Sequence, residues 1–172
     1  LARELATGAK ERAEHAVAVE VVRGELAQVC REGSVFASRF MEIERHAHVL
    51  HLASVLKGEL APGCEAMDLV RACFPAAGVV GAPKAQAMEI IAAVEGAPRG
   101  PYGGAVGWLA SSGDSELCVN IRSIVMHGQT CYLQAGGGIV AGSDPIAEYK
   151  EAMHKLAVQE QAIALAEDKS AN

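Results

Sequence analysis

Two pairs of glutamates have a spacing that suits metal binding from helices. Glu11 and Glu14 lie three residues apart near the start of the chain, and Glu148 and Glu151 repeat that spacing near its end. Residues three apart share one face of a helix. If both pairs converged, their carboxylates would form the hard oxygen site that Mg²⁺ prefers, with waters left for a substrate to replace. The alternative for either pair is a solvated helix face.

A glycine run supplies a second candidate site. Residues 136–141 fit the pattern G-x-G-x-x-A. A dinucleotide-binding fold would also need a second parallel strand about 20 residues later, where this sequence predicts a helix. Two interpretations therefore stay open. The run is either a tight strand-to-helix turn or a cradle of backbone N–H groups for a ligand carboxylate.

Several isolated polar residues are further candidates. Arg122 lies inside the apolar stretch Leu117–Val125, which predicts a strand, so its charge either faces solvent or is directed at an anion. His46, His48 and His51 suggest a transition-metal site, but three histidines from one helix turn rarely converge on one ion. A helix-surface role is favoured, with His51 able to act singly in proton handling.

These residues need helices and strands to position them. The hydrophobic spacing predicts helices over residues 11–22, 43–56, 64–73, 83–95 and 144–166, and strands over 34–40, 103–110, 116–126 and 130–134. The last three strands predict an antiparallel meander. Asp144 is expected to cap the final helix, with Pro145 in its first turn. The whole predicts an α+β fold, an antiparallel sheet flanked by helices, with a frayed polar tail at 167–172.

Composition narrows the function classes. The length of 172 residues suits one domain. A net charge of −6 with no basic stretch argues against nucleic-acid binding. No apolar run approaches the roughly 18–20 residues that span a bilayer, and the first residues do not resemble a signal peptide, which predicts a cytoplasmic protein. Five cysteines without a Cys-x-x-Cys pair argue against a zinc ribbon.

The order of the motifs resembles that of chorismate-utilising enzymes, above all the C-terminal part of the anthranilate synthase large subunit (component I). Phe74-Pro75, Gly81–Lys84 and Ala87–Ile91 resemble the FP, GAPK and AMEII signature of these large subunits and of aminodeoxychorismate synthases. The resemblance continues through Arg99–Gly107, Ile121-Arg122, Gln134–Val140 and Ser143–Glu151. It covers residues 10–155.

This resemblance implies a single partial chorismate-binding domain over residues 1–172, similar to the C-terminal half of an α/β sandwich. It implies Mg²⁺-dependent conversion of chorismate to anthranilate and pyruvate in tryptophan biosynthesis. The implied partners are a glutamine amidotransferase subunit that delivers ammonia, the upstream half of the same enzyme, and possible further copies of the chain in a homo-oligomer. An isolated chain is expected to be incomplete as a catalyst.

The family's site residues carry over onto matching positions. Glu14 and Glu151 correspond to magnesium ligands, with Glu11 and Glu148 beside them. The other matches are Gly136 and Gly138 around the ring carboxylate, Tyr102 and Arg122 on the enolpyruvyl group, His51 near the departing ring hydroxyl, and Lys155 one turn after Glu151.

Two positions depart from the family pattern. Gly78 stands where a threonine is usual, and Val80 replaces a small hydroxyl residue. The alternatives are therefore an aminodeoxychorismate synthase, or a non-catalytic relative that keeps the fold as a structural module.

Overall fold

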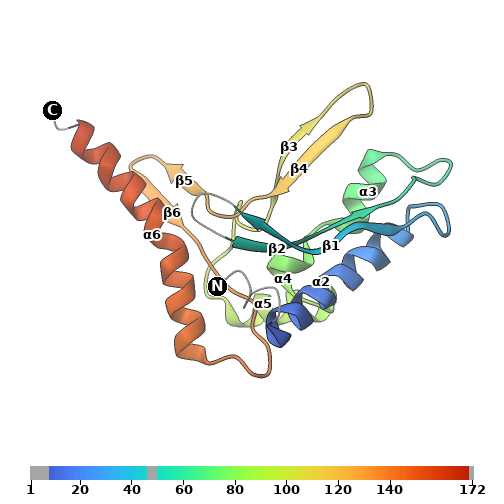
Figure 1. The fold of residues 1–172 in the computed structure, drawn as a ribbon. Helices are drawn as coiled ribbons and strands as arrows, with labels where there is room; N and C mark the ends of the chain where they lie inside the picture. The colour runs from blue at the N-terminus through green and yellow to red at the C-terminus, as the bar shows by residue number, and fades with distance from the viewer. Residues whose placement is uncertain (1–7, 46–49, 171–172) are drawn as a thin grey trace.

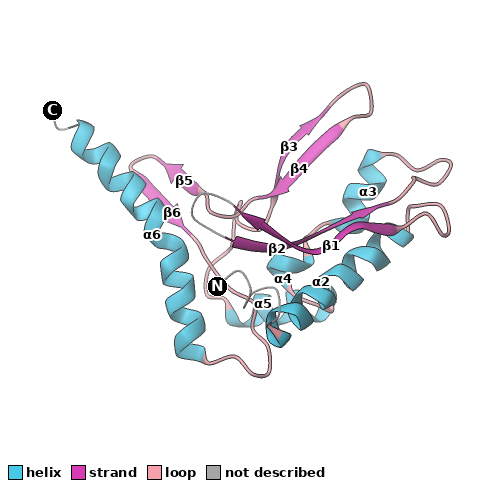
Figure 2. Cartoon of the chain, in the orientation of Figure 1, coloured by secondary structure: helices cyan, strands magenta, loops and turns pink. Residues whose placement is uncertain are grey.

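A computed structural model places residues 8–45 and 50–170, except for the side chains of residues 10, 11, 169 and 170. The elements in chain order are α2 (Ala9–Ala27), β1 (Phe36–Arg45), β2 (Leu50–Lys57), α3 (Ala66–Cys73), α4 (Ala77–Val80), α5 (Lys84–Val94), β3 (Ala105–Leu109), β4 (Ser115–Val119), β5 (Ile124–His127), β6 (Thr130–Leu133) and α6 (Pro145–Ser170) (Figure 1). Helices and small antiparallel sheets alternate, which confirms the α+β class (Figure 2).

The packed part of the molecule surrounds α2. This helix contacts α3, α4 and both strands of the β1–β2 hairpin. Val19 on α2 is buried, as are Val29 and Cys30 just beyond its end. Gly58 lies close to this core, since a β-carbon there would stand 2.7 Å from the Cys30 Sγ atom. The predicted first helix is therefore confirmed, and it contributes Val19 to the core.

A buried ion pair joins α2 to α5. The Lys84 Nζ atom lies 2.5 Å from the Glu25 Oε1 atom, and both side chains are largely buried. Lys84 Nζ also donates to the backbone carbonyl of Cys73 at 2.8 Å. One ammonium thus connects the C-terminal part of α2, the end of α3 and the start of α5.

The helix predicted over residues 43–56 is wrong. Residues 36–45 and 50–57 instead pair as the antiparallel hairpin β1–β2, with Phe36 opposite Lys57 and Arg45 opposite Leu50. Exposure alternates along β1, as expected for a strand with one covered face. Apolar residues at helical spacing in this segment also fit a two-residue alternation, and pairing across the hairpin decides between them. His46 and His48 lie outside the described residues.

A bulge in β1 fixes α2 against the hairpin. Met41 has a positive φ of 53°, and the register shifts between Arg39 and Glu42. The Met41 N–H donates to the Ser54 hydroxyl at 2.9 Å, and His15 Nε2 on α2 lies 2.8 Å from the same oxygen. Burial lowers the pKa of His15 below its ordinary value. One serine therefore holds both the bulge and the helix.

The predicted meander divides into two separate hairpins. β3 pairs with β4 and β5 with β6, and no ladder joins the two pairs among the described strands. The stretch predicted as one strand, residues 116–126, breaks between Val119 and Ile124. Arg122 lies in that break with a positive φ of 56°. The prediction that Arg122 belongs to a continuous strand is therefore wrong, because its backbone turns out of the ladder.

The final helix begins where the sequence predicts. The Ala147 N–H donates to Asp144 Oδ1 at 2.7 Å, which confirms Asp144 as the cap, and Pro145 is the first helical residue. α6 runs to Ser170, beyond the point where a frayed tail was expected. Searched over its described residues, the chain has no helix that is both long and apolar enough to span a membrane.

Candidate functional site

The glycine run passes between the Tyr102 side chain and α6. A β-carbon placed on Gly136 would stand 3.5 Å from the Tyr102 hydroxyl oxygen. A β-carbon on Gly137 would stand 3.4 Å from Glu148 Oε2 and 3.7 Å from Lys155 Nζ. A phenol, a carboxylate and an ammonium therefore line the same short stretch of backbone.

Lys155 connects the glycine run to α6 and to Arg122. Its Nζ atom donates to the Gly136 carbonyl at 3.0 Å and lies 2.7 Å from Glu151 Oε1. The backbone carbonyl of Lys155 accepts a hydrogen bond of 3.3 Å from the Arg122 guanidinium. These contacts bring together residues from the β4–β5 break, the loop after β6 and the first half of α6.

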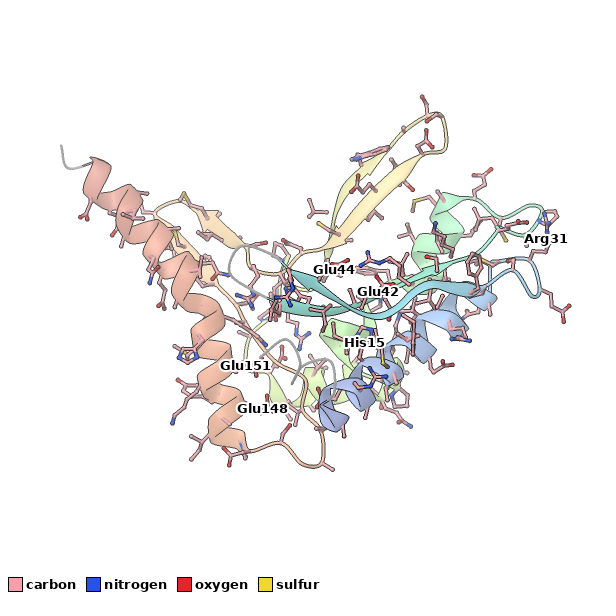
Figure 3. The ribbon with its side chains drawn as sticks, in the orientation of Figure 1. His15, Arg31, Glu42, Glu44, Glu148 and Glu151 are labelled. Carbon is pink, nitrogen blue, oxygen red and sulfur yellow. The ribbon has the colours of Figure 1, made fainter. Side chains whose placement is uncertain are left out.

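The start of α6 sets the direction of its carboxylates. A turn precedes the helix, in which the Ser143 N–H donates to the Val140 carbonyl at 2.9 Å and the Val140 N–H donates back to Ser143 Oγ at 3.1 Å. Glu148 and Glu151 follow within the first two helical turns, on the side of α6 that faces the rest of the chain (Figure 3). Both side chains reach the neighbourhood of the glycine run through the contacts above.

Arg99 holds the Tyr102 ring. Its guanidinium binds the Glu95 carboxylate through two nitrogens, at 2.8 and 2.5 Å, and donates to the Val79 carbonyl at 2.9 Å. The same group stands 5.8 Å from the centre of the Tyr102 ring, within cation–π range. The hydrogen bonds with Glu95 raise the pKa of Arg99 and lower the pKa of Glu95.

The other predicted site residues are less closely placed. His51 lies exposed near the start of β2, opposite Glu44 in the ladder, so it belongs to a strand and not to the predicted helix surface. Glu14 is exposed on α2. A β-carbon on Gly138 would have nothing within 4 Å. The catalytic and ligand roles of these residues stay predictions.

The predicted Mg²⁺ site has carboxylate oxygens of the right kind, but the described side chains are not arranged around one metal position. The side chain of Glu11 lies outside the described residues, and among the described residues no group of three or more His, Cys, Asp or Glu side chains is arranged to hold a metal. Glu148 and Glu151 supply oxygen ligands of the kind that Mg²⁺ takes. One of the Glu151 carboxylate oxygens is already paired with the Lys155 ammonium.

Sequence reasoning missed two residues that shape this site, Arg99 and Asn120. Arg99 lies four residues after Glu95 but beyond the end of α5, so their ion pair forms outside a helix and no helical pattern indicates it. Asn120 lies in the stretch Leu117–Val125, which was predicted as a strand. Its side chain instead bonds to Pro101 and Ser123, which no local pattern indicates.

Known proteins with similar sequences are chorismate-binding enzymes. A family model described as chorismate binding enzyme matches residues 1–161. The chain is 47% identical to anthranilate synthase component 1 of Mycolicibacterium smegmatis, over 96% of this chain and 32% of that protein. It is 41% identical to aminodeoxychorismate synthase component 1 of Bacillus subtilis, over 99% of this chain and 36% of that protein.

The fold agrees with these sequence relatives. The crystal structure of anthranilate synthase component I from Streptococcus pneumoniae superposes with a TM-score of 0.86 at 41% identity, covering 90% of this chain and 35% of that one. The chain therefore spans about a third of the length of the relatives that it matches.

Proposed function

This chain belongs to the chorismate-binding enzyme family, and we propose that it supplies the substrate- and metal-holding part of an anthranilate synthase. One observation supports this above the others. The Tyr102 hydroxyl, the Lys155 ammonium and the Glu148 carboxylate surround the glycine run, and Arg122 is bonded to α6 beside them. A dianionic substrate such as chorismate needs cations and hydrogen-bond donors, which Lys155, Arg122 and Tyr102 provide, while Glu148 is suited to a metal ion.

The proposed reaction is the conversion of chorismate and ammonia to anthranilate, pyruvate and water. Arg122 would bind the enolpyruvyl carboxylate through its planar fork of N–H donors, with the Tyr102 hydroxyl beside the same group. Amides of Gly136 and Gly138 would hold the ring carboxylate. His51 and Lys155 would handle protons near the departing hydroxyl and enolpyruvyl groups.

A magnesium ion fits the chemistry of the acidic residues. Glu14 and Glu151 would be its ligands, with Glu11 and Glu148 beside them, because carboxylate oxygens suit this cation. When bound, it would orient the ring carboxylate and polarise the substrate. The proposal also includes two partners. A glutamine amidotransferase subunit provides the ammonia, and the rest of a longer enzyme completes the site. The protein works in the cytoplasm, and it can form a homo-oligomer.

Aminodeoxychorismate synthase is the second candidate, favoured by the 41% identity to the Bacillus subtilis protein. Both reactions add ammonia to chorismate, and only the anthranilate synthase goes on to eliminate pyruvate. The product therefore separates the two candidates. A non-catalytic role is the third, motivated by Gly78 in place of the usual threonine. A β-carbon at Gly78 would meet nothing within 4 Å, so the backbone has room for that side chain.

Substrate binding is tested by calorimetric titration of the full chain with chorismate, with and without Mg²⁺. We expect Mg²⁺-dependent binding that Glu151→Gln weakens by roughly tenfold or more, since charged hydrogen-bonding groups contribute about 1.5–3 kcal/mol. Glu160→Gln is the matched control, an exposed glutamate further along α6. A folded chain that binds no chorismate at any Mg²⁺ concentration would overturn the proposal.

Turnover is tested in a chimera, in which this chain replaces the matching third of the Mycolicibacterium smegmatis protein. With chorismate, Mg²⁺ and ammonium, the chimera should produce fluorescent anthranilate. Accumulation of aminodeoxychorismate without anthranilate would select the second candidate. No product from a folded chimera, and none after Gly78→Thr is added, would favour a non-catalytic role.

A further inference from the structure

Asn120 lies between the two residues proposed to hold the enolpyruvyl group. It follows β4 directly, two residues before Arg122, and it faces the loop that carries Tyr102. Its backbone and side chain each make two hydrogen bonds. Three of these four bonds go to the Tyr102 loop, and one goes to the turn that contains Arg122.

The bonds to the Tyr102 loop extend the β3–β4 ladder and then go beyond it. The Asn120 N–H donates to the Gly104 carbonyl, and its carbonyl accepts from the Gly103 N–H, both at 2.8 Å. The side-chain Nδ2 atom donates to the Pro101 carbonyl, also at 2.8 Å. That carbonyl accepts the Gly104 N–H as well, at 3.0 Å, so both of its lone pairs are used.

The remaining bond reaches the Arg122 turn. The Ser123 hydroxyl donates to Asn120 Oδ1 in a short hydrogen bond, and the same hydroxyl lies 3.1 Å from the Ile121 carbonyl. Arg122 stands between these residues with a positive φ of 56°. A non-glycine residue rarely adopts that conformation without support from its surroundings, and the contact between Ser123 and Asn120 gives this support.

The nitrogen and the oxygen of the Asn120 side chain therefore join two segments, the Tyr102 loop and the Arg122 turn. Both segments lie beyond the last pair of the β3–β4 ladder, Ala105 and Val119. The backbone bonds of Asn120 would survive in any residue. The bridge from Pro101 to Ser123 needs a donor and an acceptor on two separate atoms of one short side chain, which asparagine has and aspartate, alanine and serine lack.

We propose that Asn120 is a positioning residue, which sets the Tyr102 hydroxyl and the Arg122 guanidinium at the spacing that binds an enolpyruvyl group. This rests on the proposed function, because it assumes that Tyr102 and Arg122 hold that group. Asn120 touches no substrate. Its effect is on the selectivity of the pair for a ligand that carries both a ring carboxylate and an enolpyruvyl side chain.

Three variants separate the bond to Pro101 from the bond to Ser123, and a fourth is their control. Asn120→Ala removes both side-chain bonds. Asn120→Asp keeps the acceptor for Ser123 but places a carboxylate oxygen against the Pro101 carbonyl. Ser123→Ala removes only the bond to the Arg122 turn. Ser112→Ala is the matched control, since its hydroxyl bonds to Asp114 in the turn between β3 and β4.

The ligands for the test are chorismate and benzoate, which has a ring carboxylate and no enolpyruvyl group. Asn120→Ala should weaken chorismate binding by about fivefold to tenfold, as expected for two neutral hydrogen bonds of about 1 kcal/mol or less each. Benzoate binding, measured by the same titration, should be unchanged. Asn120→Asp and Ser123→Ala should each show part of the loss, and Ser112→Ala none. Equal losses for both ligands, or no loss of chorismate binding, would overturn the proposal.

A second measurement does not depend on any ligand. In amide NMR spectra, Asn120→Ala should shift the signals of both Tyr102 and Arg122, whereas Ser123→Ala should shift Arg122 alone. If the unmodified chain fails to bind chorismate, the proposed function fails, and these shifts still decide whether Asn120 couples the two segments. A Tyr102 signal that stays in place in Asn120→Ala would overturn the coupling itself. Asn120→Asp and Ser123→Ala keep the test open should Asn120→Ala not fold.

Discussion

The two ends of this chain are built differently. Around α2, side chains are buried and polar groups are paired inside the structure, as with Glu25 and Lys84. From β3 to the end of α6, most apolar side chains are exposed, and α6 packs extensively against no other described helix or strand. Figure 1 shows α6 and the β3–β4 hairpin extending from the body of the molecule.

We call the region around α2 the packed part and the region from β3 to α6 the open part. The residues that stabilise the fold and the candidate site residues lie largely in different parts. The residues that gather around the glycine run come largely from the open part, and the residues that hold the fold together come from the packed part. Both hairpins of the open part and α6 carry exposed apolar side chains. Substitutions in the two parts should therefore affect different measurements.

The largest expected effect is at the buried ion pair. Lys84→Ala leaves the Glu25 carboxylate buried without its cation, and should lower the free energy of unfolding by about 3–5 kcal/mol. Arg31→Ala is the matched control, because its pair with Glu59 is exposed on both sides and should contribute about 1 kcal/mol or less. Urea unfolding followed by circular dichroism measures both. Similar losses of unfolding free energy in the two variants would contradict the idea that the buried ion pair holds the packed part together.

Two valine substitutions compare α2 and α6 through apolar packing alone, with no change of charge. Val19 on α2 is 3% exposed and Val158 on α6 is 66% exposed. Val19→Ala should cost about 2 kcal/mol of unfolding free energy through lost burial and a cavity. Val158→Ala should change it by about 0.5 kcal/mol or less. A large loss at Val158 in the same urea titration would indicate that α6 is packed in solution.

The cap of α6 should matter because that helix has little tertiary support. Asp144→Ala removes the bond to the Ala147 N–H and should cost about 1 kcal/mol of local stability. Amide hydrogen exchange in the first turn of α6 should accelerate, while exchange in α2 stays the same. Asp144→Ser keeps a capping oxygen and should restore slow exchange. Unchanged exchange in Asp144→Ala would show that tertiary contacts, not the cap, hold the helix start.

The smallest expected effect is a pH dependence at Arg99. Hydrogen bonding to Arg99 lowers the pKa of Glu95 below its ordinary value of 4.5. The folded state therefore holds the Glu95 proton less tightly than the unfolded state, so this pair adds stability above pH 4.5 and loses it as the pH falls through the folded pKa. Melting temperatures from about pH 6 to about pH 3 should fall less steeply in Arg99→Leu. Parallel curves would contradict this assignment.

Local signals in the sequence predicted α2, α3, α5 and α6, but not the short helix α4. The spacing in α2 and α5 and the Asp144-Pro145 start of α6 depend on neighbours a few residues away, so a single sequence contains them. The β1–β2 hairpin was mistaken for a helix, because its identity rests on pairing between residues on opposite sides of a turn. The break at Arg122 depends on hydrogen bonds from Ser123 and Asn120, which the apolar pattern does not contain.

The candidate site divides in the same way. Glu148, Glu151 and Lys155 lie at helical spacing and were predicted to share a region, and the structure places them beside the glycine run. Tyr102 was assigned by resemblance alone, and Arg122 was also a candidate because its charge lies in an apolar stretch. Their supports, Arg99 and Asn120, were not identified. Those supports act across loops, where sequence separation says little about distance in space.

The contact between Lys155 and Glu151 gives the site a built-in counterion. The lysine ammonium already neutralises a carboxylate that would otherwise repel its neighbour Glu148. A metal ion that takes this oxygen would displace the ammonium and release Lys155 from Glu151, whereas a metal ion that takes the other Glu151 oxygen would leave the contact in place. The same ammonium is bonded to the Gly136 carbonyl. Release from Glu151 would therefore leave Lys155 held at the glycine run by this second bond.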